Sequence, residues 1–221
     1  FRSAVGHRSR SNARAEILSM PPLNRDELIS VVMPVHNALP HLDAAVRSIL
    51  DQTHRSLEFV ILDDGSADGS TERLRHWANE DQRIRLFEGA RNLGPAGSSN
   101  RVIALSSAPL IARMDADDIS HPERLARQLE VLLERPEVCA VSTSCDVIDA
   151  DGQRVRDPDV WRLARKSWFA PLHGSAMFRR SAFDAVGGYR EECAFWEDQD
   201  LFVRLFAFAG GQIVTIPRTL Y

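Results

Sequence analysis

Short apolar runs alternate with amphipathic helical patterns along roughly the first 135 residues. Between the first two runs, apolar residues recur at helical spacing at Leu42, Ala45, Val46 and Ile49. The runs are Ile29–Val35, Leu57–Leu62, Ile84–Phe87 and Pro109–Ala112. A strand–helix–strand unit requires parallel strands and a right-handed crossover. The pattern therefore predicts an α/β fold with a doubly wound, mostly parallel sheet.

The pattern is different in the second half, where we expect a small antiparallel or hairpin part. Helices are expected at Ser181–Val186 and from Glu197 onwards, and residues 156–172 are expected to form a loop or short helix over the ligand-binding face. The expected strands and the hairpin turn are Val138–Val141, Asp149–Gly152, His173–Arg180 and Gln212–Ile216.

Two local signals refine the element boundaries. Pro34 cannot donate to a sheet ladder, so we expect the first strand to leave the sheet there. Ser120-His121-Pro122-Glu123 matches a capping box and predicts the start of a helix.

Residues 1–25 are polar, rich in Arg and Ser, and without a sustained period. We expect a disordered tail, a linker or a non-native extension, with Met20 as a plausible native start, although a basic membrane-surface tail is an alternative. Residues 26–221 are then expected to form a single domain.

Composition excludes some classes of protein. Of the 221 residues, 44% are hydrophobic and 26% charged, as in ordinary soluble domains, and the net charge of -4 argues against a nucleic-acid partner. Cys139, Cys145 and Cys193 are odd in number and lack metal-site spacing, so we expect reduced thiols and a cytoplasmic protein. No apolar run approaches the roughly 20 residues of a spanning helix. Two routes to a membrane stay open: peripheral association with its inner face, or attachment through a segment outside this sequence.

Carboxylates follow two of the expected strands. Asp63 and Asp64 end the second run, and Asp115, Asp117 and Asp118 follow the fourth. Parallel strands bring these ends to one edge of the sheet, where open α/β sheets bind ligands. Oxygen ligands so arranged suit Mg²⁺ or Mn²⁺. The alternative is a solvated acidic turn with an Asp helix cap.

A third acidic cluster lies at the start of the last helix. Glu197, Asp198 and Asp200 could serve only as caps, because the helix dipole stabilises carboxylates there. Placed in the crevice, one of them could instead accept a proton.

Six motifs in this order closely resemble the family 2 glycosyltransferases over about residues 29–221. They are Ser30–Asn37, Leu62–Ser66, Asn92–Gly94 with Asn100, Met114–Asp118, His173–Ser175 and Glu197–Leu201. The resemblance implies a GT-A fold, an inverting reaction, a Mn²⁺ or Mg²⁺ cofactor and a nucleotide-sugar donor, for which a UDP-sugar is expected. It also implies a nucleotide-binding half at about 29–118 and an acceptor-binding half at about 138–221.

The resemblance assigns a role to each motif. It implies Asp117 and Asp115 as metal ligands and Asp198 as the general base, with Asp200 and Glu197 as alternatives. His173 and Gly174 would contact a glycan or glycolipid acceptor, although a structural role for His173 stays open. The implied nucleotide-sugar contacts are Pro34, His36, Asn37, Asp63, Asp64, Asn92, Gly94, Asp115 and Ala116.

Two other functions remain open from the sequence. A sugar nucleotidyltransferase would share the sheet and the acidic metal site, but it normally has a Gly- and Arg-rich phosphate loop, which Pro34–Ala38 is not. A catalytically degenerate nucleotide-sugar binder would keep the pocket, and the three intact acidic clusters argue against it. The oligomeric state is left open.

Overall fold

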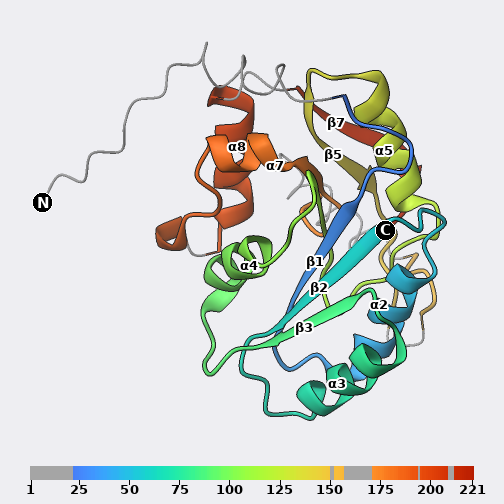
Figure 1. Cartoon of the computed structure of the whole chain (residues 1–221), viewed down its shortest axis with the longest axis vertical. Coiled ribbons are helices and arrows are strands. Elements are labelled where there is room, and N and C mark those ends of the chain that lie inside the picture. Colours follow the sequence, from blue (N-terminus) through green and yellow to red (C-terminus); the bar gives the residue numbers. More distant parts are fainter. Residues whose placement is uncertain (1–21, 150–151, 157–170, 194, 209–211) are drawn as a thin grey trace, which may run out of the picture.

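The computed structural model describes residues 22–149, 152–156, 171–193, 195–208 and 212–221. Within these residues, seven strands form one sheet in the order β3-β2-β1-β4-β6-β5-β7 (Figure 1). The strands are β1 (Ile29–Val35), β2 (Leu57–Asp63), β3 (Ile84–Glu88), β4 (Leu110–Arg113), β5 (Val138–Ser144), β6 (Met177–Arg179) and β7 (Gln212–Thr219). β6 is antiparallel to both neighbours, and the other pairs are parallel. The expected mostly parallel sheet with a small antiparallel part is confirmed.

Helices cover both faces of the sheet, as Figure 1 shows. One face packs against α2 (Leu39–Leu50), α3 (Ser70–Glu80) and α5 (Arg124–Glu134). The other face packs against α4 (Gly94–Ala104), α7 (Arg180–Ala185) and α8 (Glu197–Phe208). A short 3₁₀ helix, η1 (Glu191–Cys193), precedes α8.

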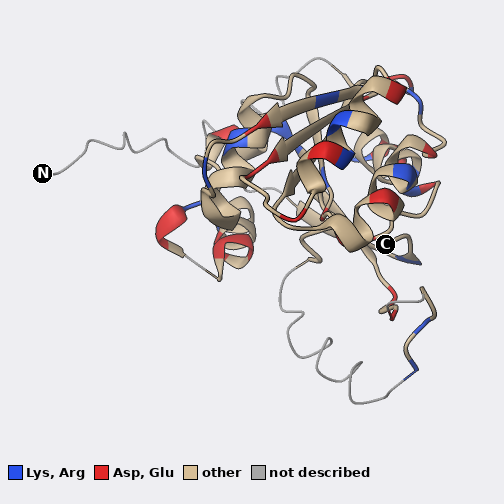
Figure 2. Cartoon of the chain, turned by 90° about the horizontal axis from the view of Figure 1, so that it is seen from below, with Lys and Arg blue, Asp and Glu red and all other residues tan. Residues whose placement is uncertain are grey.

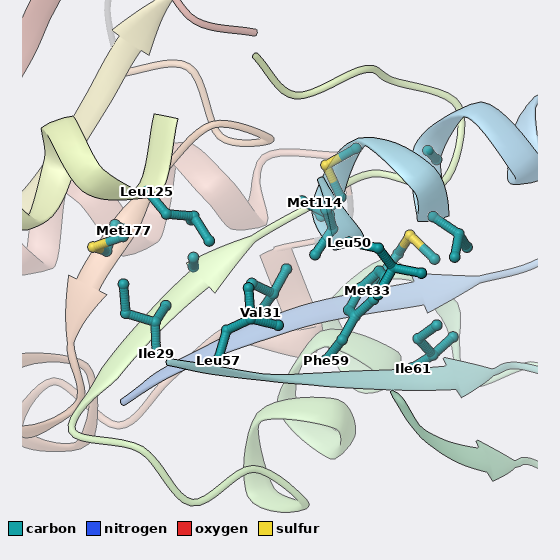
Figure 3. Packing of buried hydrophobic residues seen from close by; sticks show 14 of the residues in the cluster. Ile29, Val31, Met33, Leu50, Leu57, Phe59, Ile61, Met114, Leu125 and Met177 are labelled. Carbon is teal, nitrogen blue, oxygen red and sulfur yellow. The ribbon is translucent and has the colours of Figure 1, made fainter. Parts of the chain in front are cut away.

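Alternate residues of the central strands supply the two cores. Ile29, Val31 and Met33 of β1 point toward the α2 side, together with Phe59 and Ile61 of β2 (Figure 3). Val32 and Val60 belong to the cluster on the α4 side. This alternation follows from the two-residue period of a strand, and burial on both faces explains why these runs are almost wholly apolar.

The expectation that β1 leaves the sheet at Pro34 is wrong. Pro34 pairs with Leu62, and the ladder continues to Val35. The carbonyl of Val32 accepts from Met114 N on the β4 side, so the nitrogen of Pro34, two residues on, also faces that side, beyond the last β1–β4 pair. The missing N–H therefore costs no ladder bond.

The capping box at Ser120 is also wrong. α5 begins at Arg124, with Glu123 at the N-cap position and no side-chain cap. Ser120 Oγ instead accepts from Arg124 Nε at 2.7 Å and from Gln52 Nε2 at 3.1 Å. Two side-chain donors, of which Gln52 is 68 residues away in the sequence, therefore take the hydroxyl that the local pattern assigns to a cap.

Two expected elements are shorter in the structure. The hairpin around residues 149–152 is a single bridge between Ile148 and Arg154, and residues 150–151 lie outside the described part. The strand expected within His173–Arg180 is confined to β6. Most of the loop expected at 156–172 lies outside the described residues, as does the tail at 1–21.

A buried carboxylate joins three strands at the end of the sheet opposite the acidic strand ends. Glu58 accepts hydrogen bonds from Ser30 Oγ at 2.6 Å and from Ser107 N and Oγ at 2.6 and 2.8 Å, and it pairs with Arg85. Burial opposes ionisation of Glu58, but these donors outweigh it and lower its pKa to about 2. The charged form is therefore the one that stabilises the fold.

We predict that Glu58→Gln lowers the free energy of unfolding at pH 7 by about 1–3 kcal/mol. Because the folded pKa lies below the ordinary value of 4.5, the stabilisation is present above pH 4.5 and is lost as pH falls toward about 2. The variant should therefore show a shallower loss of stability in that window, measured by urea denaturation. Glu80→Gln, at an exposed position, is the control; equal slopes for all three proteins would contradict the assignment.

Candidate active site

A cleft of about 240 Å³ opens where β1, β2 and β4 end side by side. The loop that leads into α4 forms one wall, and the β4 end forms the other. The lining residues are Pro34, Val35, His36, Asp64, Asn92, Gly94, Pro95, Ser98 and Arg113. Five of the residues expected to contact a nucleotide sugar therefore lie in one cavity, and they come from three separate segments of the chain.

The two neighbouring aspartates at the end of β2 have different surroundings. Asp64 lines the cleft, and its two carboxylate oxygens accept from Leu93 N at 3.0 and 2.9 Å. Asp63 accepts from Ser66 N at 3.1 Å and from Thr71 Oγ1 at 2.5 Å, so it closes the turn into α3. Asp64, not Asp63, is therefore the one that lines the cleft.

The loop after β1 is held to the end of β2. His36 Nδ1 lies 3.0 Å from the carbonyl oxygen of Asp64, and Asn37 Nδ2 lies 3.1 Å from His36 Nε2. Asn37 has a left-handed backbone (φ 54°), and its side chain accepts from Ala67 N at 2.8 Å. Asn37 therefore positions His36 and does not line the cleft.

The loop before α4 completes the cavity. Asn92 Oδ1 accepts from Gly94 N at 2.7 Å, and Gly94 has a φ of 76°, which a side chain would strain. Asn100, from the Asn92 motif, bonds the backbone of Tyr189 through both its amide atoms at 2.9 Å. The motif thus shapes the cleft and also anchors the segment that leads to α8.

The acidic end of β4 is crowded with charge. Arg113 Nη2 pairs with Asp115 Oδ1 at 2.9 Å, and Asp115 N donates to Tyr221 Oη at 3.1 Å. Asp117 is exposed. Burial raises the pKa of Asp118 to about 6, with a further contribution from Asp115. The three carboxylates therefore form one region of concentrated negative charge.

Ala116 and Gly174 flank this acidic end in different ways. Ala116 is buried in the core cluster on the α2 side, so its side chain does not face the cleft. Gly174 packs against the carboxylate of Asp115 and the hydroxyl of Tyr221: a Cβ there would lie 2.6 and 2.5 Å from their oxygens. The segment His173–Gly174 therefore touches the acidic end of β4.

His173 connects the acidic end of β4 to the segment that leads to α8. Its Nε2 lies 2.6 Å from Tyr189 Oη. Burial, and then the charge of Arg113, lower the pKa of His173 to about 4, against opposing effects of Asp115 and Asp198. The imidazole is thus neutral at pH 7, and the carboxylates of Asp115 and Asp198 both lie within electrostatic reach of it.

The three acids at the start of α8 are not equivalent. Asp200 pairs with Arg204 Nη2 at 2.6 Å and with Arg190 Nη1 at 3.5 Å. Glu197 Oε2 is buried without a hydrogen-bond partner among the described residues. Within the described part of the chain, Asp198 accepts a hydrogen bond only from its neighbour Gln199 N, at 2.7 Å. Asp200 is therefore engaged in ion pairs, which leaves Asp198 and Glu197 for chemistry.

A metal ion would need ligands beyond the protein at this site. Among the described residues, no three His, Cys, Asp or Glu side chains are grouped closely enough to hold a metal ion by themselves. Two carboxylates with substrate phosphates and water are, however, a common arrangement for Mg²⁺. The exposed Asp117 and the neighbouring Asp115 fit that donor set.

Sequence reasoning did not single out Arg113, Tyr189, Tyr221 or Ser98 as site residues. Tyr221 lies 106 positions from Asp115 in the chain, and the ring of Tyr221 packs under the guanidinium of Arg124 at 5.3 Å. No local pattern could reveal that contact. Arg113 had a signal: it is a charged residue between an apolar run and an acidic cluster.

The sequence profile described as Glycosyl transferase family 2 matches residues 30–187. That span exceeds half of the chain, so the chain belongs to this family. The EpsE protein of Bacillus subtilis (strain 168) is 31% identical over 194 residues, which cover 83% of this chain and 68% of EpsE. The resemblance deduced from the six motifs is confirmed.

Two solved structures are similar in fold. The mannosyltransferase PcManGT from Pyrobaculum calidifontis, in complex with GDP-Man and Mn²⁺, has a TM-score of 0.71 at 24% identity over 94% of this chain and 61% of its own. S. aureus TarS 1–349 in complex with UDP-GlcNAc has a TM-score of 0.70 at 18% identity over 87% and 57%. This chain thus spans less than two thirds of either solved chain. The fold is of the GT-A type, as expected.

Two further observations concern the charge distribution and the helices. Basic and acidic segments are interspersed in the view of Figure 2. Among the described residues, no helix has the length and apolar character needed to cross a bilayer.

We predict that Gly174→Ala displaces the carboxylate of Asp115 and lowers the free energy of unfolding by about 1–3 kcal/mol. The new Cβ would meet Tyr221 Oη and Asp115 Oδ2 well inside contact distance. Urea denaturation measures the loss. In a Tyr221→Phe background, where the nearest oxygen is absent, the same substitution should cost less. A Gly174→Ala variant as stable as the wild type would show that the packing around Asp115 is loose.

Proposed function

We propose that the protein transfers a sugar from a nucleotide sugar, with a UDP-sugar as the first candidate, to an acceptor hydroxyl with inversion at the anomeric carbon. One observation carries the proposal. In a member of Glycosyl transferase family 2, the cleft at the β1, β2 and β4 ends adjoins the acidic end of β4. The charges of Asp115 and Asp198 both favour the protonated form of His173, so both carboxylates lie near its ring. Donor, leaving group and proton acceptor would then meet in one place.

The cleft would hold the nucleoside part of the donor. Asp64 still has free acceptor positions, because an ionised carboxylate offers about four and Leu93 N uses only part of them. It can accept an N–H of the base. His36 and Pro34 offer a planar ring and an apolar surface beside it. PcManGT holds GDP-Man and TarS holds UDP-GlcNAc, so both nucleotides are candidates to test.

Asp117 and Asp115 would hold a divalent cation together with the donor's diphosphate. Bound there, the cation offsets the charge that develops on the leaving nucleoside diphosphate. Mn²⁺ is the first candidate, since the similar PcManGT structure contains it. Asp117 is exposed and so free to meet the incoming phosphate, whereas Asp115 is held in place by Arg113 and Tyr221.

Asp198 is the proposed general base. It takes the proton from the acceptor hydroxyl while the hydroxyl oxygen bonds to the anomeric carbon and the bond to the diphosphate oxygen breaks. A single displacement of this kind inverts the configuration. The ion pairs of Asp200 make it the weaker alternative, and Glu197, with a buried unpartnered oxygen, is the stronger one.

The acceptor would approach past His173 and Gly174. The family resemblance favours a glycan or glycolipid, at the cytoplasmic side of a membrane in the latter case. The neutral His173 imidazole, bonded to Tyr189, fits a role in shaping this side of the site.

The test is incubation with UDP- and GDP-sugars and Mn²⁺, with products followed by ³¹P NMR. Release of UDP or GDP, with water as acceptor, supports the transferase. Asp198→Asn should bind the donor as tightly as the wild type. It should release UDP or GDP at least about 100-fold more slowly, because only proton transfer is lost. The anomer of the sugar first released, identified by ¹H NMR, reports inversion. Binding without release indicates a degenerate binder. Formation of UTP or GTP and a sugar 1-phosphate, only when pyrophosphate is added, indicates a nucleotidyltransferase.

We predict that Asp117→Asn weakens Mn²⁺-dependent UDP or GDP binding by at least about tenfold, since it removes a charged metal ligand. Isothermal titration with Mn²⁺ and with EDTA separates the metal-dependent part. In EDTA the variant and the wild type should bind alike. Unchanged affinity with Mn²⁺ would remove Asp117 from the ligand set.

A further inference from the structure

Arg113 is a buried cation with unused hydrogen-bonding capacity. It is the last residue of β4, and its side chain is 8% exposed. One nitrogen, Nη2, pairs with Asp115 Oδ1 at 2.9 Å. Nε and Nη1 are buried and have no hydrogen-bond partner among the described residues. Buried donors in folded proteins are almost always paired, so this edge of the guanidinium requires an explanation.

The other buried arginines that the structure describes behave differently. Arg124 donates Nε to Ser120 Oγ and Nη1 to a backbone carbonyl, and Arg179 donates Nε and Nη2 to backbone carbonyls. Arg204 donates Nε to Asp200 and Nη1 to the carbonyl of Val186, and its Nη2, which makes no hydrogen bond within the described residues, lies 2.6 Å from Asp200 Oδ2 in the ion pair. Each of these side chains has a structural function that its partners account for. The single ion pair of Arg113 leaves most of its guanidinium unexplained.

The position of Arg113 indicates what could complete its hydrogen bonds. It lines the cleft, and among the described lining residues it is the one Lys or Arg. The surrounding carboxylates, Asp64 in the cleft and Asp115 to Asp118 beyond it, would repel an anion. A ligand that carries a diphosphate therefore needs a local cation at this wall, besides any metal ion.

We propose that Arg113 is a donor-binding residue whose free guanidinium edge binds phosphate oxygens of the nucleoside diphosphate. This proposal depends on the function proposed above. The planar fork of an arginine matches two phosphate oxygens at once, which a lysine cannot do. The pair with Asp115 fixes the plane of the fork, so little rotational freedom is lost when the donor binds.

The competing explanation is that Arg113 only positions Asp115 for the metal and that water completes its hydrogen bonds. The two explanations differ in what happens without metal. A direct phosphate contact contributes to diphosphate binding in EDTA and contributes nothing to binding of the nucleoside alone. A positioning function appears only when Mn²⁺ is present, and Asp115→Asn should then reproduce it.

The experiment is isothermal titration in EDTA with UDP, GDP, uridine and guanosine. The proteins are the wild type, Arg113→Lys, Arg113→Gln and the control Arg179→Lys. Arg179 is a buried arginine of β6 that lies opposite Leu110, the first residue of β4, and donates to the carbonyls of Val138 and Leu132. We expect both Arg113 variants to lose about 10- to 100-fold in affinity for the diphosphate that the wild type binds. Nucleoside affinity should stay within about twofold, and Arg179→Lys should match the wild type.

The outcomes separate the two proposals. Equal diphosphate affinity of wild type and Arg113→Lys in EDTA, with a defect that appears only with Mn²⁺, overturns the phosphate contact and leaves the proposed function intact. An equal loss for nucleoside and diphosphate also overturns it. A wild-type protein that binds neither UDP nor GDP, with or without Mn²⁺, overturns both. Thermal unfolding of each ligand-free variant identifies a folding defect. If Arg113→Lys is unfolded, the comparison is made with Arg113→Gln instead.

Discussion

The parallel pairing of β1 with β2 on one side and with β4 on the other is the constraint on which the site depends. It aligns Ile29 with both Leu57 and Leu110 and so brings the three strand ends to one edge. β4 is three residues shorter than β1, and its chain leaves the sheet while β1 and β2 continue. This difference in length opens the cleft beside Pro34 and sets Arg113 in its wall. A one-residue slip in register would move the side chain of Arg113 to the opposite face of the sheet.

Charge balance is the second constraint at this edge. Asp115, Asp117 and Asp118 are too close in the sequence to be separated, and burial of Asp118 already opposes its ionisation. Arg113 neutralises Asp115, and Arg124 approaches from α5 with its ring contact to Tyr221. The remaining negative charge suits a cation that arrives with the substrate. A site built in this way would be stable without ligand and still favour metal together with a diphosphate.

The sequence predicted the fold well where a period was long and uninterrupted. The strands at 29–35 and 57–63 and the helix stripe through Leu125 and Leu129 are such cases, because burial enforces them in any tertiary context. Local signals failed where a distant residue used the same group, as Gln52 uses the hydroxyl of Ser120. The expectation from Pro34 was wrong because a proline ends strand pairing only where its nitrogen faces a neighbouring strand. That information lies in the topology and not in the residue.

The candidate site shows the same division between what the sequence reveals and what it hides. Parallel topology made the gathering of Asp64 and the Asp115 segment predictable, whereas the choice among Glu197, Asp198 and Asp200 was not. Asp200 and Arg204 are four residues apart and share a face of α8, so their ion pair fixes the helix from that side. Asp198, two positions earlier, lies about 200° away around the helix axis. One residue is thus engaged in ion pairs that hold α8, and the other lies on a different side of the helix.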